Sequence, residues 1–267
     1  MDSTMNALQW DRHPDMNSPI MIAAFEGWND GGSASTNSVR RLIEVTQAEK
    51  FASIDPEEFY VFSENRPTVR LVEGNLVDPG TRIIDWQSNE FHHGKLPGSG
   101  QDVIFFLGTE PNLKWRTYCE HLASMAQQYQ TRTVITLGAY LADVLYTLPV
   151  QVTGFTNNPI LEKRAGLERS NYEGPTGIVG VFTDHCRHLG MDTLSLWAAV
   201  PYYISIPNPK AVQSLMTKLA SIFEMDLDFS GLQQDADSFD NEINDVVAKD
   251  PNVAAYVREL KKREFLN

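Results

Sequence analysis

The chain has 267 residues, of which 42% are hydrophobic and 10% aromatic, and its formal net charge is −13. This length and composition are typical of a globular protein with one large domain or two small ones. The negative charge repels phosphate backbones and anionic membrane surfaces, so we expect neither a nucleic-acid partner nor a membrane partner.

The low cysteine content indicates a protein of a reducing compartment. The chain has two, Cys119 and Cys186, and they form no CxxC motif, so we expect two buried thiols rather than a disulfide. The first ten residues lack a cationic start followed by an apolar core, and no apolar run is long enough to span a bilayer. These features predict a soluble, cytoplasmic protein.

After a polar lead-in over residues 1–18, eight apolar runs predict strands. They cover residues 20–25, 59–62, 82–86, 103–107, 133–137, 150–153, 178–182 and 194–200. Between several of these runs the apolar residues are spaced to form one face of a helix, first over 34–43 and later over 115–129. The alternation of strands with helices predicts an α/β fold.

Two of the runs have the pattern of central strands. Residues 103–107 and 133–137 are almost uninterrupted apolar stretches, which suit parallel strands covered on both faces. A glycine follows each of them, Gly108 and Gly138, just as Gly27 follows the first strand. If the three strands are parallel neighbours, their glycine loops lie at one edge of the sheet, where α/β proteins bind ligands.

The C-terminal part differs in charge. Residues 224–245 contain eight acidic residues and no lysine or arginine, which indicates a solvated face or a linker. Asp250 and Pro251 then predict the start of a helix whose last turn is basic. We therefore divide the chain into a lead-in (1–18), an α/β domain (19–234) and a helical hairpin (235–267) packed on that domain.

The loop after the first strand is the first candidate site. It begins with Gly27, and a functional interpretation makes Trp28 a stacking platform, Asn29 an orienting amide and Asp30 an acid, a base or an acceptor. The alternative is that Asp30 caps the following helix and the glycines form the turn. The loop matches neither the phosphate-binding P-loop nor the dinucleotide-binding fingerprint.

Other polar residues follow later strands. Glu110 and Asn112 lie in the loop after the fourth run. Glu110 and the Asp30 carboxylate of the first loop can divide acid and base roles if they meet. Alternatively, Asn112 caps the following helix. Tyr140 either lines a pocket or is a core aromatic. Asn157 lies in a polar loop, and Glu173 lies in a Gly/Pro turn whose default role is structural.

The histidines and cysteines do not have the spacing of a metal site. His185 and Cys186 are adjacent and point apart on a helix, and no second pair of ligands has suitable spacing. We place His92 and His93 in a surface loop. From the ligand spacing we expect no metal, and we also expect no cofactor. The chain lacks a Gly-x-Ser-x-Gly elbow, which leaves little basis for a serine hydrolase.

Five motifs in order resemble the proteasome assembly chaperone family, second type, in its bacterial branch. They are residues 25–30 (FEGWND); 107–112 (LGTEPN) with Trp115-Arg116; 137–139 (LGA) with Ala142-Asp143; 172–177 (YEGPTG); and 195–198 (SLWA) before Val200-Pro201 and 207–211 (PNPKA). The resemblance extends from residue 20 to the end of the chain.

The resemblance implies a three-layer α/β/α sandwich similar to the phosphorylase/hydrolase-like fold of nucleoside phosphorylases, in an oligomer for which fold analogy favours a trimer. Some relatives are labelled ATP-grasp-like, but this chain has no basic, Gly-rich phosphate cradle. Eukaryotic relatives dock on proteasome α subunits through a C-terminal hydrophobic-Tyr-any tail. Residues 265–267 here are Phe-Leu-Asn, and the missing tyrosine counts against such docking.

Two functions remain open from the sequence. The first is a non-catalytic protein-interaction or assembly factor that forms a homo-oligomer and has a protein partner. The second is a small-molecule-binding protein or enzyme that uses the loops of Asp30, Glu110 and Tyr140. A polar-floored pocket favours the second function, whereas an exposed apolar patch favours the first.

Overall fold

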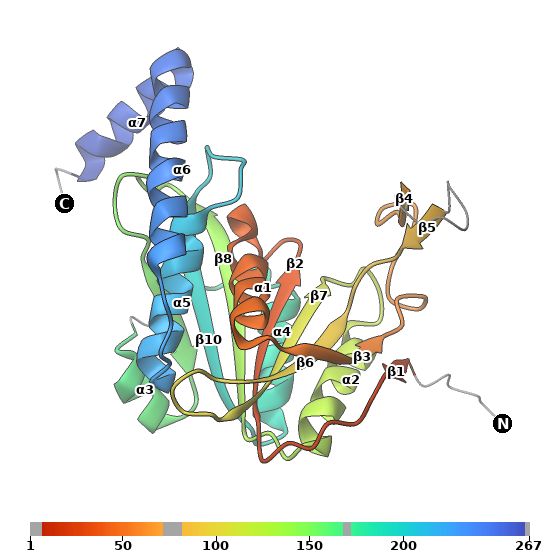
Figure 1. Cartoon of the computed structure of the whole chain (residues 1–267). Helices are drawn as coiled ribbons and strands as arrows, with labels where there is room; N and C mark the ends of the chain where they lie inside the picture. Colours follow the sequence, from red (N-terminus) through yellow and green to blue (C-terminus); the bar gives the residue numbers. More distant parts are fainter. Residues whose placement is uncertain (1–6, 72–81, 168–171, 265–267) are drawn as a thin grey trace, which may run out of the picture.

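A mixed eight-stranded sheet forms the centre of the molecule (Figure 1). The computed structural model describes residues 7–71, 82–167 and 172–264. The strand order is β1-β3-β6-β7-β2-β8-β10-β9. The four central strands are parallel: β7 (Asp102–Thr109), β2 (Ile20–Glu26), β8 (Thr133–Ala142) and β10 (Asp192–Pro201). The outer strands are antiparallel: β1 (Leu8–Trp10), β3 (Glu49–Ile54), β6 (Glu90–Lys95) and β9 (Val152–Thr156).

Helices cover both faces of the sheet, which is why the central strands are apolar throughout. Alternate side chains of β2 enter different cores. Ile22 and Ala24 pack toward α1 (Ala34–Thr46), α3 (Pro159–Ala165) and α5 (Pro209–Phe223), whereas Met21 and Phe25 pack toward α2 (Trp115–Gln128) and α4 (Ile178–His188). The predicted α/β class and the central parallel strands are therefore confirmed.

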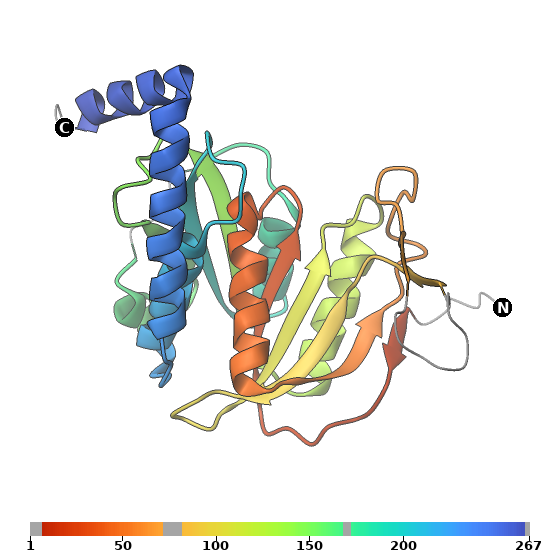
Figure 2. The same ribbon diagram turned by 45° about the horizontal axis from the view of Figure 1, so that its top comes forward.

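Three helices, α5 and then α6 (Ser230–Lys249) and α7 (Pro251–Glu264), follow β10, the last strand of the sheet. α6 packs against α5, and α7 follows after a sharp turn. The Asp250 carboxylate accepts the backbone N–H of Asn252 at 2.8 Å, which confirms the predicted cap. Figure 2 shows α7 crossing the end of α6 rather than running back along it. The acidic stretch is mostly the solvated face of α6.

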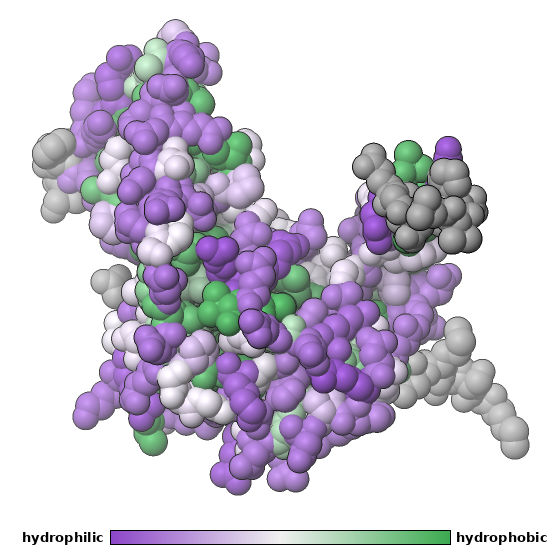
Figure 3. Space-filling model, in the orientation of Figure 1, coloured by the Kyte–Doolittle hydropathy of each residue, from purple (hydrophilic) through white to green (hydrophobic). Residues whose placement is uncertain are grey.

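Two projections rise beside the end of the sheet toward which β2 and β7 point (Figure 1). One is the α6–α7 arm. The other is a separate two-stranded sheet of β4 (Thr68–Leu71) and β5 (Arg82–Asp85). In Figure 3, the surface of the arm is largely hydrophilic, and hydrophobic residues form a band across the middle of this face.

Several sequence-based assignments are wrong. Residues 178–182 form the start of α4, not a strand, because Ile178, Val179 and Phe182 are buried at helical spacing and a short apolar run does not distinguish the two structures. Residues 59–62 are not a strand either. His92 and His93 lie in β6, not in a surface loop, and Gly108 and Gly138 lie inside β7 and β8 rather than in loops.

The thiols behave as predicted. Cys119 and Cys186 are buried and free, and burial raises the pKa of the Cys119 thiol to about 12. Among the described residues, no three His, Cys, Asp or Glu side chains are grouped as a metal site requires. No helix in the same residues has the length and apolarity needed to cross a membrane.

Candidate functional site

The end of the parallel strands is built around the loop that follows β2. Gly27 has φ +132°, a backbone conformation that residues other than glycine rarely adopt. The chain then continues beside β8, because the Ala139 N–H donates to the Asn29 carbonyl at 2.8 Å. The loop is therefore fixed to the sheet at the edge where α/β proteins bind their ligands.

Asp30 is a structural acceptor in this loop. Its carboxylate accepts the N–H of Ser35 at 2.9 Å and that of Thr36 at 3.1 Å, both in the first turn of α1. The hydroxyls of the same two residues donate to it at 2.5 Å. The predicted capping role is confirmed, although the cap position of α1 is occupied by Ser33 and Asp30 lies three residues before it.

Glu110 and Asn29 meet at the start of α4. Glu110 is half-buried, and its Oε2 accepts the N–H of Ile178 at 3.0 Å. Burial raises the pKa of Glu110, and the Ile178 N–H opposes that rise. Gly177 makes the approach possible: a Cβ there would overlap Asn29 Oδ1 and lie 2.7 Å from Glu110 Oε2. The oxygens of two loops therefore converge on the N-terminus of α4.

Aromatic side chains are exposed around this point. Trp28 is 60% exposed and Tyr140 40% exposed, so Tyr140 is not the core aromatic that one interpretation predicts. Tyr140 lies on the α4 side of β8. It is four residues after Thr136, so both side chains are on one face of the strand, and the Thr136 hydroxyl lies 2.8 Å from that of Thr183 in α4. Tyr172, in the loop before α4, is 66% exposed.

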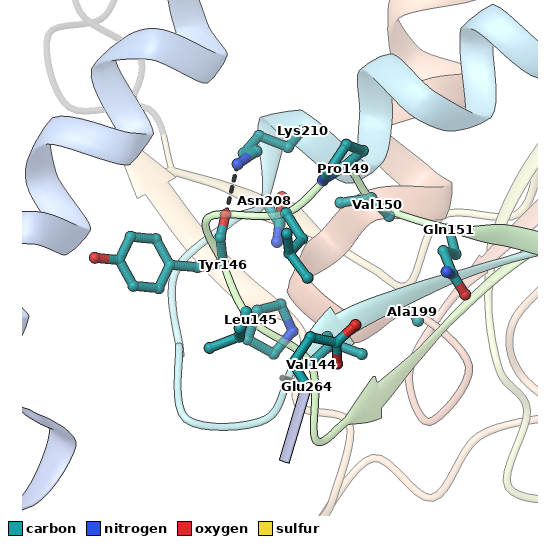
Figure 4. Close-up of a pocket in the computed structure, with 12 residues that line it drawn as sticks. Val144, Leu145, Tyr146, Pro149, Val150, Gln151, Ala199, Asn208, Lys210 and Glu264 are labelled. Atoms are coloured by element: carbon teal, nitrogen blue, oxygen red, sulfur yellow. Dashed lines mark hydrogen bonds between the residues drawn. The ribbon is translucent and has the colours of Figure 1, made fainter. Parts of the chain in front are cut away.

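A separate cavity of about 400 Å³ lies beside the β8–β9 connection (Figure 4), and no sequence signal indicated it. Its lining is mostly apolar and includes Leu145, Leu148 and Val150. Lys210 is at its border, where its Nζ donates to the Tyr146 carbonyl at 2.5 Å and to Asp240 of α6 at 2.9 Å. This lysine therefore ties α5 and the connection to the arm.

Comparison with known proteins identifies the family. The family model for the PAC2 family matches residues 24–247. The chain belongs to the PAC2 family. It is 38% identical to a PAC2 family protein from Streptomyces avermitilis, with a TM-score of 0.80, 90% of this chain covered and 99% of the other.

A proteasome-assembly chaperone homologue from Mycobacterium tuberculosis is also 38% identical to this PAC2 protein, with a TM-score of 0.79 and coverage of 89% of this chain and 99% of that one. The archaeal proteasome activator PbaB from Pyrococcus furiosus has the same fold at 19% identity, with a TM-score of 0.72 and coverage of 90% and 97%. No curated protein matches the chain.

Two of the predicted site residues of this PAC2 protein serve other purposes. Asn112 does not cap α2, whose cap residue is Lys114; instead its Oδ1 accepts the Val61 N–H at 3.0 Å and holds a neighbouring loop. Asn157 lies at the other end of the strands, beside the start of β10. There its side chain donates a hydrogen bond to the Met191 carbonyl and accepts one from the Thr193 N–H. Neither contributes to the convergence at α4.

The chemistry of the edge is acidic. Three segments there, residues 26–33 and 108–113 with the ends of β2 and β7, and residues 172–177 before α4, contain four carboxylates and no lysine or arginine. The carboxylates are Glu26, Asp30, Glu110 and Glu173, of which Glu26 and Glu173 are exposed. Such an edge disfavours phosphate groups and favours donors and cations.

Proposed function

We propose that this PAC2 protein is a non-catalytic protein-interaction or assembly factor, and that the edge around Trp28 is its interaction surface. The observation that carries the proposal is the group of exposed aromatic residues there. Trp28, Tyr140 and Tyr172 come from three separate segments, and aromatic residues are enriched in the well-packed centres of interfaces. The name of the Mycobacterium tuberculosis relative supports the same function.

The same surface is also proposed to bind further copies of this chain. We propose that the protein forms a homo-oligomer, with a trimer favoured by analogy with nucleoside-phosphorylase-like three-layer folds, and that a further protein partner binds the assembled form. Identical chains assemble with closed symmetry in most soluble oligomers.

The test compares partners captured by the native chain with those captured by a variant carrying Trp28→Ser and Tyr140→Ser. We expect the variant to lose the proteins that the native chain retains, additional copies of itself included. A matched control is Phe155→Ser, because Phe155 is 42% exposed on β9, away from this edge. Equal capture by the double variant and the native chain would contradict the proposal.

A small-molecule-binding function is the second candidate, and the 400 Å³ cavity favours it. Its size and mostly apolar lining suit a small apolar ligand. The acidic edge, in contrast, leads us to expect no ATP binding. A ligand at 100 times its Kd stabilises a protein by about 2.7 kcal/mol, or roughly 5–10 °C in Tm at this chain length. A Tm rise of that size with ATP and magnesium would favour an enzyme instead.

A further inference from the structure

Asn29 has a buried acceptor that nothing in the described residues satisfies. The residue is only 6% exposed, yet its Oδ1 has no hydrogen-bond partner. A buried polar atom left unpaired costs about 1–3 kcal/mol, so such atoms are uncommon in folded proteins. The oxygen lies against Gly177 at the N-terminus of α4.

The group beside it is also an acceptor. Glu110 Oε2 lies close to the same point and already accepts the Ile178 N–H. A second carboxylate or a phosphate at this position would meet two acceptor oxygens and the acidic residues Glu26 and Glu173 at the rim. The usual anion-binding role of a helix N-terminus is therefore filled here by the chain's own Glu110.

A positively charged donor that enters beside the half-buried Glu110 and reaches the buried Asn29 Oδ1 would satisfy both oxygens. An ammonium group has three N–H donors and no acceptor, and a charge-assisted hydrogen bond to a carboxylate is stronger than a neutral one. Trp28 directly precedes Asn29 and carries an exposed indole, a ring type that stabilises cations at its face. Glu110 is half-buried and reachable from solvent, and no competing lysine or arginine is present in the three segments.

We propose that Asn29 and Glu110 form a binding site for a primary ammonium group, supplied by a lysine side chain of a protein partner. The source of the ammonium rests on the proposed function, whereas the ammonium chemistry rests on the oxygens alone. The site is thus the polar, specificity-determining part of the aromatic edge.

The test uses the isolated chain and small probes, so it does not depend on the partner. Nα-acetyl-lysine methylamide is titrated while the amide NMR signals of Gly177 and Ile178 are followed. Nα-acetyl-norleucine methylamide, which lacks the amine, is the matched negative probe, and butylamine separates a free amine from a lysine side chain. We expect saturable shifts with both amines and none with the norleucine derivative; tighter binding of the lysine derivative favours a lysine source.

Glu110→Gln is the decisive variant because its remaining oxygen can still accept the Ile178 N–H. We expect it to bind the lysine derivative at least about tenfold more weakly, since one charge-assisted hydrogen bond is lost. Glu44→Gln at the far end of α1, an exposed carboxylate paired with Arg41, is the control and should bind normally.

Equal responses to the lysine and norleucine derivatives would overturn the proposal, as would the absence of any response. The absence of a response would mean that the Asn29 amide satisfies itself within the chain by donating to Glu110. If the probes bind as expected but the double variant of Trp28 and Tyr140 still captures all partners, the ammonium site stands and the proposed function fails. The two failures are therefore distinguishable.

Discussion

Asp30 shows how one side chain fixes the start of a helix. Four donors from Ser35 and Thr36 converge on its carboxylate. We expect Asp30→Ala to lower the free energy of unfolding by about 2 kcal/mol, because it leaves buried donors unpaired. Asp30→Asn should cost less, since its carbonyl oxygen still accepts the two backbone N–H groups. Denaturant titration of both variants measures this, and equal losses would contradict the capping account.

Gly177 is required by space rather than by backbone conformation. Its φ is −100°, which any residue adopts, but a Cβ would overlap Asn29 Oδ1. We expect Gly177→Ala to destabilise the protein by about 1–3 kcal/mol. Gly231→Ala on α6 is the control, because the added Cβ meets only the flexible end of Arg41. A neutral Gly177→Ala variant would mean that the Asn29 and Gly177 segments are not held together.

Residue chemistry could be predicted better than residue geometry. The capping role of Asp30 follows from its residue type and its place before an amphipathic segment. The meeting of Asn29, Glu110 and Gly177 does not, because it joins three loops that are far apart in the sequence. Because the sequence pattern predicts a strand over residues 178–182, it also does not predict the N-terminus of α4, on which these loops converge.

At the scale of elements, Asp102 joins the start of β7 to β6 and to the N-terminal segment. Its carboxylate accepts from Lys95 Nζ at 2.9 Å and from the Asn17 N–H at 3.0 Å, and His93 Nε2 lies at 3.0 Å. Burial raises the pKa of Asp102, but these hydrogen bonds outweigh burial and lower it to about 2. The pKa is thus lower in the folded chain than in the unfolded one.

This lowered pKa predicts a loss of stability in acid. The contribution of Asp102 is complete above its unfolded pKa, near 4, and is lost as the pH falls toward 2. We expect Asp102→Asn to remove about 1 kcal/mol at pH 7 and to reduce the decline of stability between pH 4 and pH 2. Unfolding curves across that range test it, and an unchanged acid decline would contradict the assignment.

The element pattern itself was partly readable from the sequence. The long apolar strands β2, β7, β8 and β10 were recognisable because burial on both faces makes them uniformly apolar. The sequence does not predict β1, β3, β4 and β6, because they are outer or isolated strands with mixed composition. β4, for example, is exposed along its whole length. Antiparallel outer strands leave weaker signals than buried parallel ones.

As a whole molecule, the protein is proposed to act through contacts with other chains. The exposed residues of the edge, Trp28, Tyr140 and Tyr172, are large aromatics that most monomeric proteins cover or scatter. We expect self-association through this surface. It is also independent of any unidentified partner or ligand.

The most direct measurement is the mass of the purified protein by light scattering at micromolar concentration. One chain has a mass of 30.0 kDa. We expect a multiple of that value for the native protein, and a smaller mass for the variant with Trp28→Ser and Tyr140→Ser. A native mass of 30.0 kDa throughout the concentration range would contradict it.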